Sequence, residues 1–479
     1  MKALFAASEA APFAKTGGLA DVAGTLPPAL AALGHDVRLV LPLYQAVDRE
    51  RFGLQHAATF TVPLGSWKER CDVLTGSLPG GVTTYFVRKD VYFDRPGLYG
   101  TTRGDFRDNA ERFIFFSRAV LELCRALDFR PDIIHCNDWQ TALVPFYVKK
   151  LYGESELFRR TRTVFTIHNL GYQGVFLQED MRYTSLGMDS FTPQTLEYWG
   201  KMNLMKGALL TADAITTVSR SYSREIQTPE YGYGLEGVLM DRAADLYGIV
   251  NGIDYGTWDP AHDQAIAQQF DADAPAGKIA CRSALRKITG LPESEAPLAG
   301  MVARLAAQKG LDILTEALPG LLEQGLQVVI LGTGDDKYLK LLALVEKQYP
   351  DRMRLISRFD DPAARAVYAG SDLFLMPSLY EPCGLGQMIA LRYGSVPVVR
   401  NTGGLADTVI DHPGGMGTGF LFEEYSAEAL TECVQRAQRA FQDKKEWAAL
   451  MRNGMKQDFS LERMAGEYVA VYEKLLGAH

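Results

Sequence analysis

The chain has 479 residues, enough for two to four domains and a sizeable core. Hydrophobic residues make up 47% and charged residues 23% of the chain, and its formal net charge is −8. This acidic balance, with no long run of Lys or Arg, argues against nucleic acid or an anionic membrane as the main partner.

The six cysteines are scattered and form no Cys-x-x-Cys pair, which argues against a disulfide framework or a zinc site. This usage fits a reducing, cytoplasmic location. The apolar run at the N-terminus is interrupted by Ser8 and Glu9, so it predicts a first β-strand rather than a signal sequence. No apolar stretch approaches the roughly 20 residues that span a bilayer.

Short apolar runs alternate with helix-like periodicity, which predicts parallel sheets covered by helices on both faces. The predicted strands are residues 3–7, 36–41, 84–87, 133–135, 162–166, 214–218, 297–302, 327–331, 353–356, 373–376 and 396–399. Helical periodicity lies between most of them, for example at residues 26–33, 111–127 and 311–324. Pro27 and Pro28 predict that the first helix bends or restarts at that point.

A domain boundary is predicted at the Asn251-Gly252 turn, because a polar, alanine-rich segment and a new helix–strand pattern follow it. The predicted parts are one α/β domain over residues 1–252, a second over residues 258–456, and a C-terminal amphipathic helix over residues 459–476. Ligands of open parallel sheets bind beyond the carboxyl ends of the strands, so polar clusters that follow strands carry functional weight.

The hexapeptide Thr-Gly-Gly-Leu-Ala-Asp occurs twice, at residues 16–21 and 402–407. Adjacent glycines allow a tight turn that brings N–H groups close to a ligand, and the apolar pattern that follows predicts a helix N-terminus at each copy. Helix N-termini attract anions, so the two loops suggest a phosphate-bearing ligand. The alternative is two helix-entry turns of similar composition.

Three polar clusters follow strands of the first half. Lys15, beside the first glycine turn, supplies a mobile charge that suits a diphosphate, although it could also be a surface-loop lysine. Asp138 precedes Trp139, and such a pair can hold a sugar; the alternative is that Asp138 caps the following helix. His168 and Asn169 lie in a glycine-flanked loop at a strand end, where we favour function over structure.

Two more clusters follow strands of the second half. Arg304 and Lys309 lie on a loop that enters a helix, where they can clamp both phosphates of a leaving nucleoside diphosphate. The alternative is a solvated basic turn. Glu381 is held between proline and glycine residues after its strand, which makes it a rigidly placed acceptor for hydroxyls.

Together these motifs resemble one family, the bacterial glycogen synthases and plant starch synthases, which are retaining glucosyltransferases of the GT-B architecture. The matching stretches appear in family order and are residues 15–22, 137–139, 168–174, 232–237, 251–254, 304–310, 381–385 and 402–407. They cover nearly the whole chain, which makes the resemblance highly specific.

The resemblance implies an α/β fold with two Rossmann-like domains facing a central cleft, and a C-terminal helix, within residues 457–479, that crosses back to the N-terminal domain. It implies transfer of glucose from ADP-glucose to the non-reducing end of an α-1,4-glucan such as glycogen, with retention of configuration and release of ADP. No metal and no cofactor is expected, because cationic side chains and helix N-termini would stabilise the departing ADP. Neither nucleic acid nor a membrane is an expected partner, and oligomeric state is not readable.

The resemblance also assigns roles to single residues. The expected catalytic residues are Lys15, Asp138, His168, Arg304, Lys309 and Glu381. The expected substrate-binding residues are Glu9, Thr16, Gly17, Gly18, Asp21, Asn169, Asn251, Phe359, Cys383, Gly384, Leu385, Thr402, Gly403 and Gly404. Phe359 is expected to stack on adenine, and the Gly403 and Gly404 amides to add a second phosphate contact.

One position departs from many retaining GT-B enzymes, which carry a second glutamate eight residues after the first. Here that residue is Ile389, as is typical of glycogen and starch synthases. No carboxylate pair reads as a nucleophile plus an acid, so we favour front-face attack assisted by the departing phosphate over a double displacement. The alternatives are a UDP-glucose-dependent synthase and a catalytically inactive glucan-binding protein.

Overall fold

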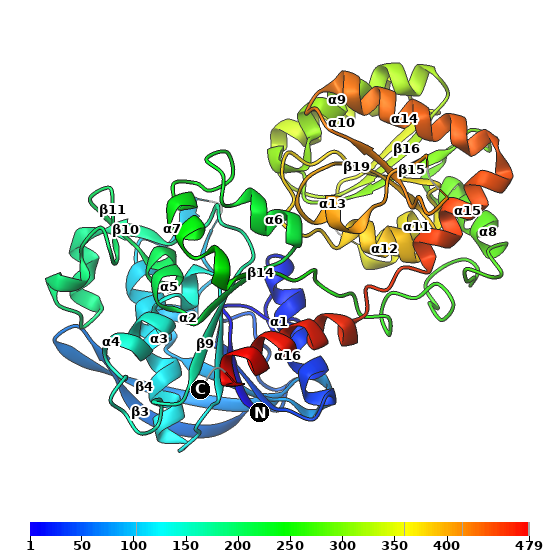
Figure 1. The fold of residues 1–479 in the computed structure, drawn as a ribbon. Coiled ribbons are helices and arrows are strands. Elements are labelled where there is room, and N and C mark those ends of the chain that lie inside the picture. The colour runs from blue at the N-terminus through cyan, green and yellow to red at the C-terminus, as the bar shows by residue number, and fades with distance from the viewer. Residues whose placement is uncertain (102, 359, 414, 478–479) are drawn as a thin grey trace. The chain divides into compact units, whose positions relative to one another are not determined.

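The computed structural model describes residues 1–101, 103–358, 360–413 and 415–477. The chain forms two compact units. Unit 1 contains Met1–Ile249 and the segment from Leu461 onward, and unit 2 contains Val250–Ser460 (Figure 1). The chain therefore passes from unit 1 to unit 2 three residues before the predicted first-domain end, and it returns at Leu461.

Unit 1 is built on a nine-stranded sheet in the order β14-β13-β9-β8-β1-β2-β5-β4-β3. Its strands are β1 (Lys2–Ala6), β2 (Asp36–Pro42), β3 (Gln55–Leu64), β4 (Trp67–Ser77), β5 (Thr83–Arg88), β8 (Ile133–Asn137), β9 (Arg162–Ile167), β13 (Ala214–Thr217) and β14 (Leu246–Gly248). All neighbours are parallel except β4, which is antiparallel to β3 and β5.

The helices of unit 1 are α1 (Gly18–Ala32), α2 (Asp90–Phe93), α3 (Asn109–Ala126), α4 (Leu143–Lys150), α5 (Leu204–Thr211), α6 (Arg220–Glu225), α7 (Glu236–Asp241) and α16 (Leu461–Gly477). The predicted restart at Pro27 and Pro28 is wrong, because α1 runs through both prolines. Leu26, Pro27 and Leu30 are buried, and this packing outweighs the backbone hydrogen bonds that the prolines remove.

Two small sheets complete unit 1. One is a hairpin of β6 (Gly100–Thr101) and β7 (Gly104–Asp105). The other has three antiparallel strands in the order β10-β12-β11. These strands are β10 (Val175–Leu177), β11 (Glu197–Tyr198) and β12 (Lys201–Asn203).

Unit 2 is built on a six-stranded parallel sheet in the order β17-β16-β15-β18-β19-β20. Its strands are β15 (Leu298–Val302), β16 (Gln327–Leu331), β17 (Met353–Ile356), β18 (Leu373–Met376), β19 (Val396–Arg400) and β20 (Phe420–Phe422). Numbered along the chain this is the order 3-2-1-4-5-6 of the doubly wound Rossmann fold.

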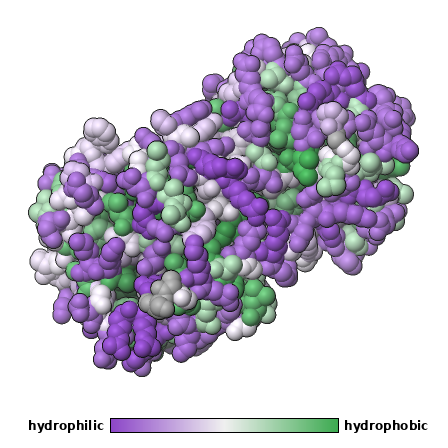
Figure 2. Space-filling view, in the orientation of Figure 1, coloured by the Kyte–Doolittle hydropathy of each residue, from purple (hydrophilic) through white to green (hydrophobic). Residues whose placement is uncertain are grey.

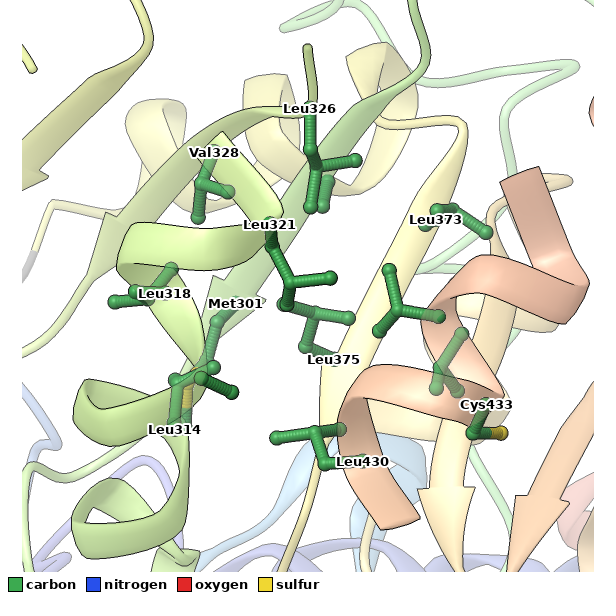
Figure 3. Packing of buried hydrophobic residues seen from close by; sticks show 14 of the residues in the cluster. Met301, Leu314, Leu318, Leu321, Leu326, Val328, Leu373, Leu375, Leu430 and Cys433 are labelled. Carbon is green, nitrogen blue, oxygen red and sulfur yellow. The ribbon is translucent and has the colours of Figure 1, made fainter. Parts of the chain in front are cut away.

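The helices of unit 2 are α8 (Gly277–Thr289), α9 (Leu311–Glu323), α10 (Asp336–Gln348), α11 (Asp361–Gly370), α12 (Gly386–Arg392), α13 (Gly403–Thr408), α14 (Ala427–Gln442) and α15 (Lys444–Met455). Figure 1 shows α9, α10 and α14 on one side of the sheet and α8, α11 and α12 on the other. Figure 3 shows the core between the sheet and the first group, with Leu314, Leu318 and Leu321 of α9, Leu373 and Leu375 of β18, and Leu430 and Cys433 of α14.

Every predicted strand is present, and its ends differ from the prediction by at most two residues. β3, β4, β14, β20 and the small sheets were not predicted. None of the described helices is long and apolar enough to cross a membrane. The face of the molecule shown in Figure 2 is mostly hydrophilic, with small hydrophobic patches between the polar residues.

The C-terminal helix α16 packs against α1 and returns the end of the chain to unit 1, as predicted. Its Tyr472 hydroxyl lies 2.6 Å from Nδ1 of His135 on β8, and both side chains are buried. Burial lowers the pKa of His135 to about 3, so the imidazole is neutral. A neutral, buried histidine therefore joins α16 to the centre of the sheet.

The contact between His135 and Tyr472 gives a stability prediction. Tyr472→Phe removes the hydroxyl and leaves a buried ring nitrogen without its partner. We expect the free energy of unfolding to fall by about 1–3 kcal/mol, which differential scanning calorimetry would detect as a lower Tm.

A matched control is Tyr349→Phe, which deletes a hydroxyl that donates to Glu323 at the surface of unit 2, 2.8 Å away. This variant should leave the Tm nearly unchanged. Equal losses of Tm in the two variants would show that the buried hydrogen bond contributes no more stability than the exposed one.

Candidate functional site

Each main sheet has a pair of neighbouring parallel strands whose following connections lead to opposite halves of the sheet. In unit 1 this pair is β1 and β8, and in unit 2 it is β15 and β18. Loops that leave the carboxyl ends of such strand pairs diverge and form the usual ligand site of open α/β sheets. The predicted site residues follow these strands in both units.

In unit 2 the loops after β15 and β18 are joined by hydrogen bonds. The Leu379 amide donates to the Gln308 carbonyl at 2.9 Å, and the Gln308 side chain donates to the Tyr380 carbonyl at 3.2 Å. Gly310 has φ +71°, and a Cβ there would lie 1.8 Å from the Pro377 carbonyl oxygen. Only glycine fits where the two loops meet.

At this junction Lys309 Nζ donates to Glu381 Oε2 at 2.6 Å. Ser378 Oγ donates to the same oxygen at 3.0 Å, which fixes the buried carboxylate from a second direction. No described residue donates to Oε1 of Glu381, so that oxygen can accept a ligand hydroxyl. Arg304 is exposed, and its side chain makes no hydrogen bond or ion pair with any described residue; its backbone carbonyl accepts from the Ala306 amide at 3.0 Å.

The second Thr-Gly-Gly copy packs against the Glu381 loop. As predicted, it begins a helix, with Thr402 at the N-cap of α13. A Cβ on Gly403 would lie 2.0 Å from the Glu381 carbonyl oxygen, and a Cβ on Gly404 would lie 2.1 Å from that of Cys383. The Gly404 amide already donates to the Glu381 carbonyl at 3.0 Å. That amide thus holds a loop and is not the open phosphate donor that we expected.

Other predicted residues of unit 2 surround this loop. Cys383 is buried beside the backbone of Asn251, and burial raises the pKa of its thiol to about 12, so it is not a reactive thiolate. Asn251 is buried, and its Oδ1 has no hydrogen-bond partner among the described residues. Gly384 has φ +76°, and Leu385 precedes α12. Phe359 lies outside the described residues.

In unit 1 the first Thr-Gly-Gly copy also begins a helix, with Gly17 at the N-cap of α1. The Glu9 carboxylate accepts hydrogen bonds from the Thr16 amide and, at 2.8 Å, from the Thr16 hydroxyl, and the Gly17 amide also contacts it. Burial raises the pKa of Glu9 to about 7. The Glu9 carboxylate thus contacts the Gly17 amide, one of the two glycine amides that we expected to face a phosphate; no such contact is seen for the Gly18 amide among the described residues.

Two flanking residues of the first copy are more accessible. Lys15 Nζ donates to Asp21 Oδ1 at 2.6 Å, and about half of the Lys15 side chain is exposed (53%). A surface ion pair of this kind contributes little stability, so Lys15 can change partner at small cost. Gly18 is exposed, and nothing lies within 4 Å of a Cβ built on it.

Asp138 follows β8 in a conformation that is rare for any residue but glycine, with φ +54° and ψ 179°. Its Oδ1 accepts from the His168 amide at 2.8 Å, and the Asn169 amide also contacts the carboxylate. Burial raises the pKa of Asp138 to about 7, and the charge of Glu9 adds to the rise. The side chain makes no capping bond to the following helix, so the alternative reading is wrong.

His168 follows β9, and burial lowers the pKa of its imidazole to about 3. Its Nε2 lies 2.9 Å from Asn137 Oδ1, while Asn137 Nδ2 donates to the Ala6 carbonyl at 3.0 Å. Because Asn137 must present its oxygen, His168 carries its proton on Nε2, and Nδ1 is an acceptor. Asn169 Oδ1 accepts from the Gly171 amide at 2.9 Å and shapes the turn.

The structure brings Glu9, Thr16 and Gly17 together, and it joins Asp138 to His168 and Asn169. In unit 2 it joins Lys309 and Glu381 to the second Thr-Gly-Gly copy.

Sequence reasoning missed the residues that position these groups: Asn137, Gln308 and Ser378. Asn137 and Gln308 lie inside the family-matching stretches 137–139 and 304–310, and Ser378 lies three residues before Glu381. Among the described residues, no group of three or more His, Cys, Asp or Glu could hold a metal ion.

Comparisons with known proteins give the family of the chain. A family described as the starch synthase catalytic domain matches residues 2–241, and a second, glycosyl transferases group 1, matches residues 282–456. The glycogen synthase of Geotalea uraniireducens (strain Rf4) is 50% identical over 99% of both chains. Glycogen synthase 2 of Geobacter sulfurreducens (strain ATCC 51573 / DSM 12127 / PCA) is 49% identical over 98% of both chains.

Solved structures give the same family. The catalytic domain of starch synthase IV from Arabidopsis thaliana, bound to ADP and acarbose, superposes with a TM-score of 0.91, covers 99% of both chains and is 34% identical. A sucrose-phosphate synthase from Thermosynechococcus elongatus shares the fold alone, with a TM-score of 0.64 and 18% identity. The fold is thus the two-domain GT-B glycosyltransferase fold, and the chain belongs to the family of bacterial glycogen synthases and plant starch synthases.

Proposed function

We propose that this protein takes glucose from ADP-glucose, adds it to the non-reducing end of an α-1,4-glucan, retains the configuration at the anomeric carbon and releases ADP. The observation that carries the proposal is the Lys309–Glu381 pair at the switch point of unit 2, with Arg304 on the same loop as Lys309. The binding of ADP and acarbose by the starch synthase IV relative supports an adenine nucleotide as the donor.

The charges at this pair suit a departing diphosphate. Arg304 and Lys309 supply two cations, and such groups stabilise the negative charge that develops on a leaving phosphate. Glu381 would meanwhile accept a donor-sugar hydroxyl on Oε1. The proposed reaction therefore needs no metal and no cofactor, because side chains provide the positive charge.

Unit 1 supplies carboxylates and a neutral imidazole. Asp138 and Glu9 can balance the positive charge of an oxocarbenium-like sugar, and a neutral His168 does not oppose that charge. The acceptor hydroxyl would attack on the face that the ADP leaves, and the departing phosphate oxygen would take the hydroxyl proton. A trapped glycosyl adduct on Asp138 or Glu381 would contradict this front-face route.

The six cysteines are free and buried, which suits the reducing cytoplasm that we propose as the location. A UDP-glucose-dependent synthase is the nearest alternative function, because no described side chain distinguishes the two bases.

The first functional prediction concerns Arg304. Because its side chain has no described partner, Arg304→Ala should leave the Tm unchanged while it removes one of the two cations. We expect kcat/KM with ADP-glucose and glycogen to fall about 100-fold, as measured by ADP release. Wild type should turn over ADP-glucose far faster than UDP-glucose.

The matched control is Lys337→Ala, which removes an exposed cation at the start of α10. It should keep wild-type turnover. An Arg304→Ala enzyme as active as this control would contradict the diphosphate clamp. Faster turnover with UDP-glucose than with ADP-glucose would instead contradict the proposed donor.

The second prediction concerns the buried carboxylate of Glu9. Its pKa is about 7 in the folded protein and 4.5 when unperturbed, so between these pH values the folded state binds more protons than the unfolded state. Stability from this group is therefore present at low pH and is lost as the pH rises towards 7. Glu9→Gln removes that loss, and its amide oxygen can still accept from Thr16.

We expect the Tm of Glu9→Gln, relative to wild type, to rise between about pH 5 and pH 8. Calorimetric scans of both proteins at the two pH values measure this difference. A relative Tm that stays constant or falls towards pH 8 would contradict the burial of a raised-pKa carboxylate at the start of α1.

A further inference from the structure

The hairpin between β11 and β12 turns through Trp199 and Gly200, whose φ angles are +52° and +76°. A two-residue turn with positive φ at both positions is of type I′, which favours Asn-Gly and disfavours bulky residues at its first position. Trp199 is nevertheless 86% exposed. Trp199 thus has a strained backbone conformation although its side chain is exposed to solvent. Residues with strained backbone angles cluster at functional sites, so this turn points to function.

Other aromatic side chains lie around this turn. Tyr198 donates from its hydroxyl to the Tyr233 carbonyl at 2.9 Å, and the Trp199 indole contacts the same hydroxyl. Tyr172 and Tyr233 are exposed by 58% and 42%, and a Cβ on Gly171 would lie 3.7 Å from the Tyr233 ring. We call Tyr172, Tyr198, Trp199 and Tyr233 the aromatic platform.

A buried glutamine holds the platform together. Gln173 Nε2 donates to the Tyr233 carbonyl at 3.2 Å, and its Oε1 accepts from Asn203 Nδ2 at 2.7 Å. The backbone carbonyl of Gln173 accepts from the Met205 amide at 3.1 Å. The loop of Tyr172, the loop of Tyr233 and the end of β12 are therefore fixed to one another.

The platform is also continuous with the proposed reaction site of unit 1. Residues 168–174 form one loop that begins at His168 and contains Tyr172 of the platform. Phe176 of β10 packs edge-on against Trp139, with ring centroids 5.5 Å apart, and Trp139 follows Asp138. A Cβ on Gly174 would lie 2.7 Å from the Trp139 ring, so the contact is close. Figure 1 shows β10 and β11 together at one edge of unit 1.

We propose that the aromatic platform binds a stretch of the glucan acceptor, with sugar rings stacked on Trp199 and the neighbouring tyrosines. The C–H face of a glucose ring is apolar and matches an aromatic face, while Tyr hydroxyls and the exposed Lys201 ammonium can bond its hydroxyls. The acceptor is a long polymer, and the platform extends the surface that holds its reacting end. This inference rests on the proposed function for the identity of the polymer.

The cross-strand register supports a ligand surface. Leu177 of β10 pairs with Lys201 of β12, which pairs with Tyr198 of β11, so these side chains form one row on one face of the small sheet. Phe176 points to the opposite face, where it packs on Trp139. On the face that carries the row, Leu177 is exposed by 61% and Lys201 is exposed, while Tyr198 contacts the loop of Tyr233.

The test is Trp199→Asn, which removes the ring and places the preferred Asn-Gly pair in the turn, so the hairpin should stay folded. We expect the affinity for glycogen, measured without donor by retardation in native gels that contain glycogen, to fall about five- to tenfold. The KM for glycogen should rise by a similar factor, with kcat and the KM for ADP-glucose unchanged. The matched control is Trp67→Ala, at a partly exposed tryptophan on β4, which should behave as wild type.

Equal retardation of wild type and Trp199→Asn would overturn the proposal, as would equal losses in the Trp199 and Trp67 variants. Retardation that depends on Trp199 in a protein that shows no turnover with ADP-glucose would support the platform and contradict the proposed function. The two ideas therefore fail separately.

Discussion

The ion pair between Lys309 and Glu381 is the interaction on which the organisation of unit 2 depends. It joins the loops that leave β15 and β18, the strands at which the sheet changes its order of connection. The Glu381 carboxylate is buried, and an unpaired buried charge is costly, so the partly buried Lys309 ammonium compensates its charge. The pair thus holds a cation beside a carboxylate at the carboxyl ends of β15 and β18, where we propose that the donor binds.

The glycines around this pair serve contact between loops more than contact with a ligand. Gly310, Gly403 and Gly404 each lie where a Cβ would collide with a backbone carbonyl of the Glu381 loop or of Pro377. In unit 1 the amides at the start of α1 bind Glu9. Both Thr-Gly-Gly copies therefore make contacts within the protein, while the side chains of Lys15 and Arg304 are exposed.

The sequence predicted the strands well, because short apolar runs such as residues 328–331 and 373–376, placed between helix-like patterns, are typical of buried strands of a parallel sheet. β3 and β4 were not predicted, although Phe60, Val62 and Leu64 of β3 alternate with more exposed residues, and neither was the short β10-β12-β11 sheet. The site residues could be found because they follow strand ends. Their hydrogen-bond partners, such as Asn137 for His168, could not, since the pairing depends on tertiary distances. The left-handed Trp199 turn could not be read either, because tryptophan is an unusual residue for it.

A double-mutant cycle tests the central claim most directly: kcat/KM for ADP-glucose in wild type, Lys309→Met, Glu381→Gln and the double variant. If the two side chains act as one unit, the double variant should be as active as the less active of the two single variants. The losses of transition-state stabilisation in the single variants will then not add. Losses that simply add would contradict this account, because they would show that Lys309 and Glu381 act independently.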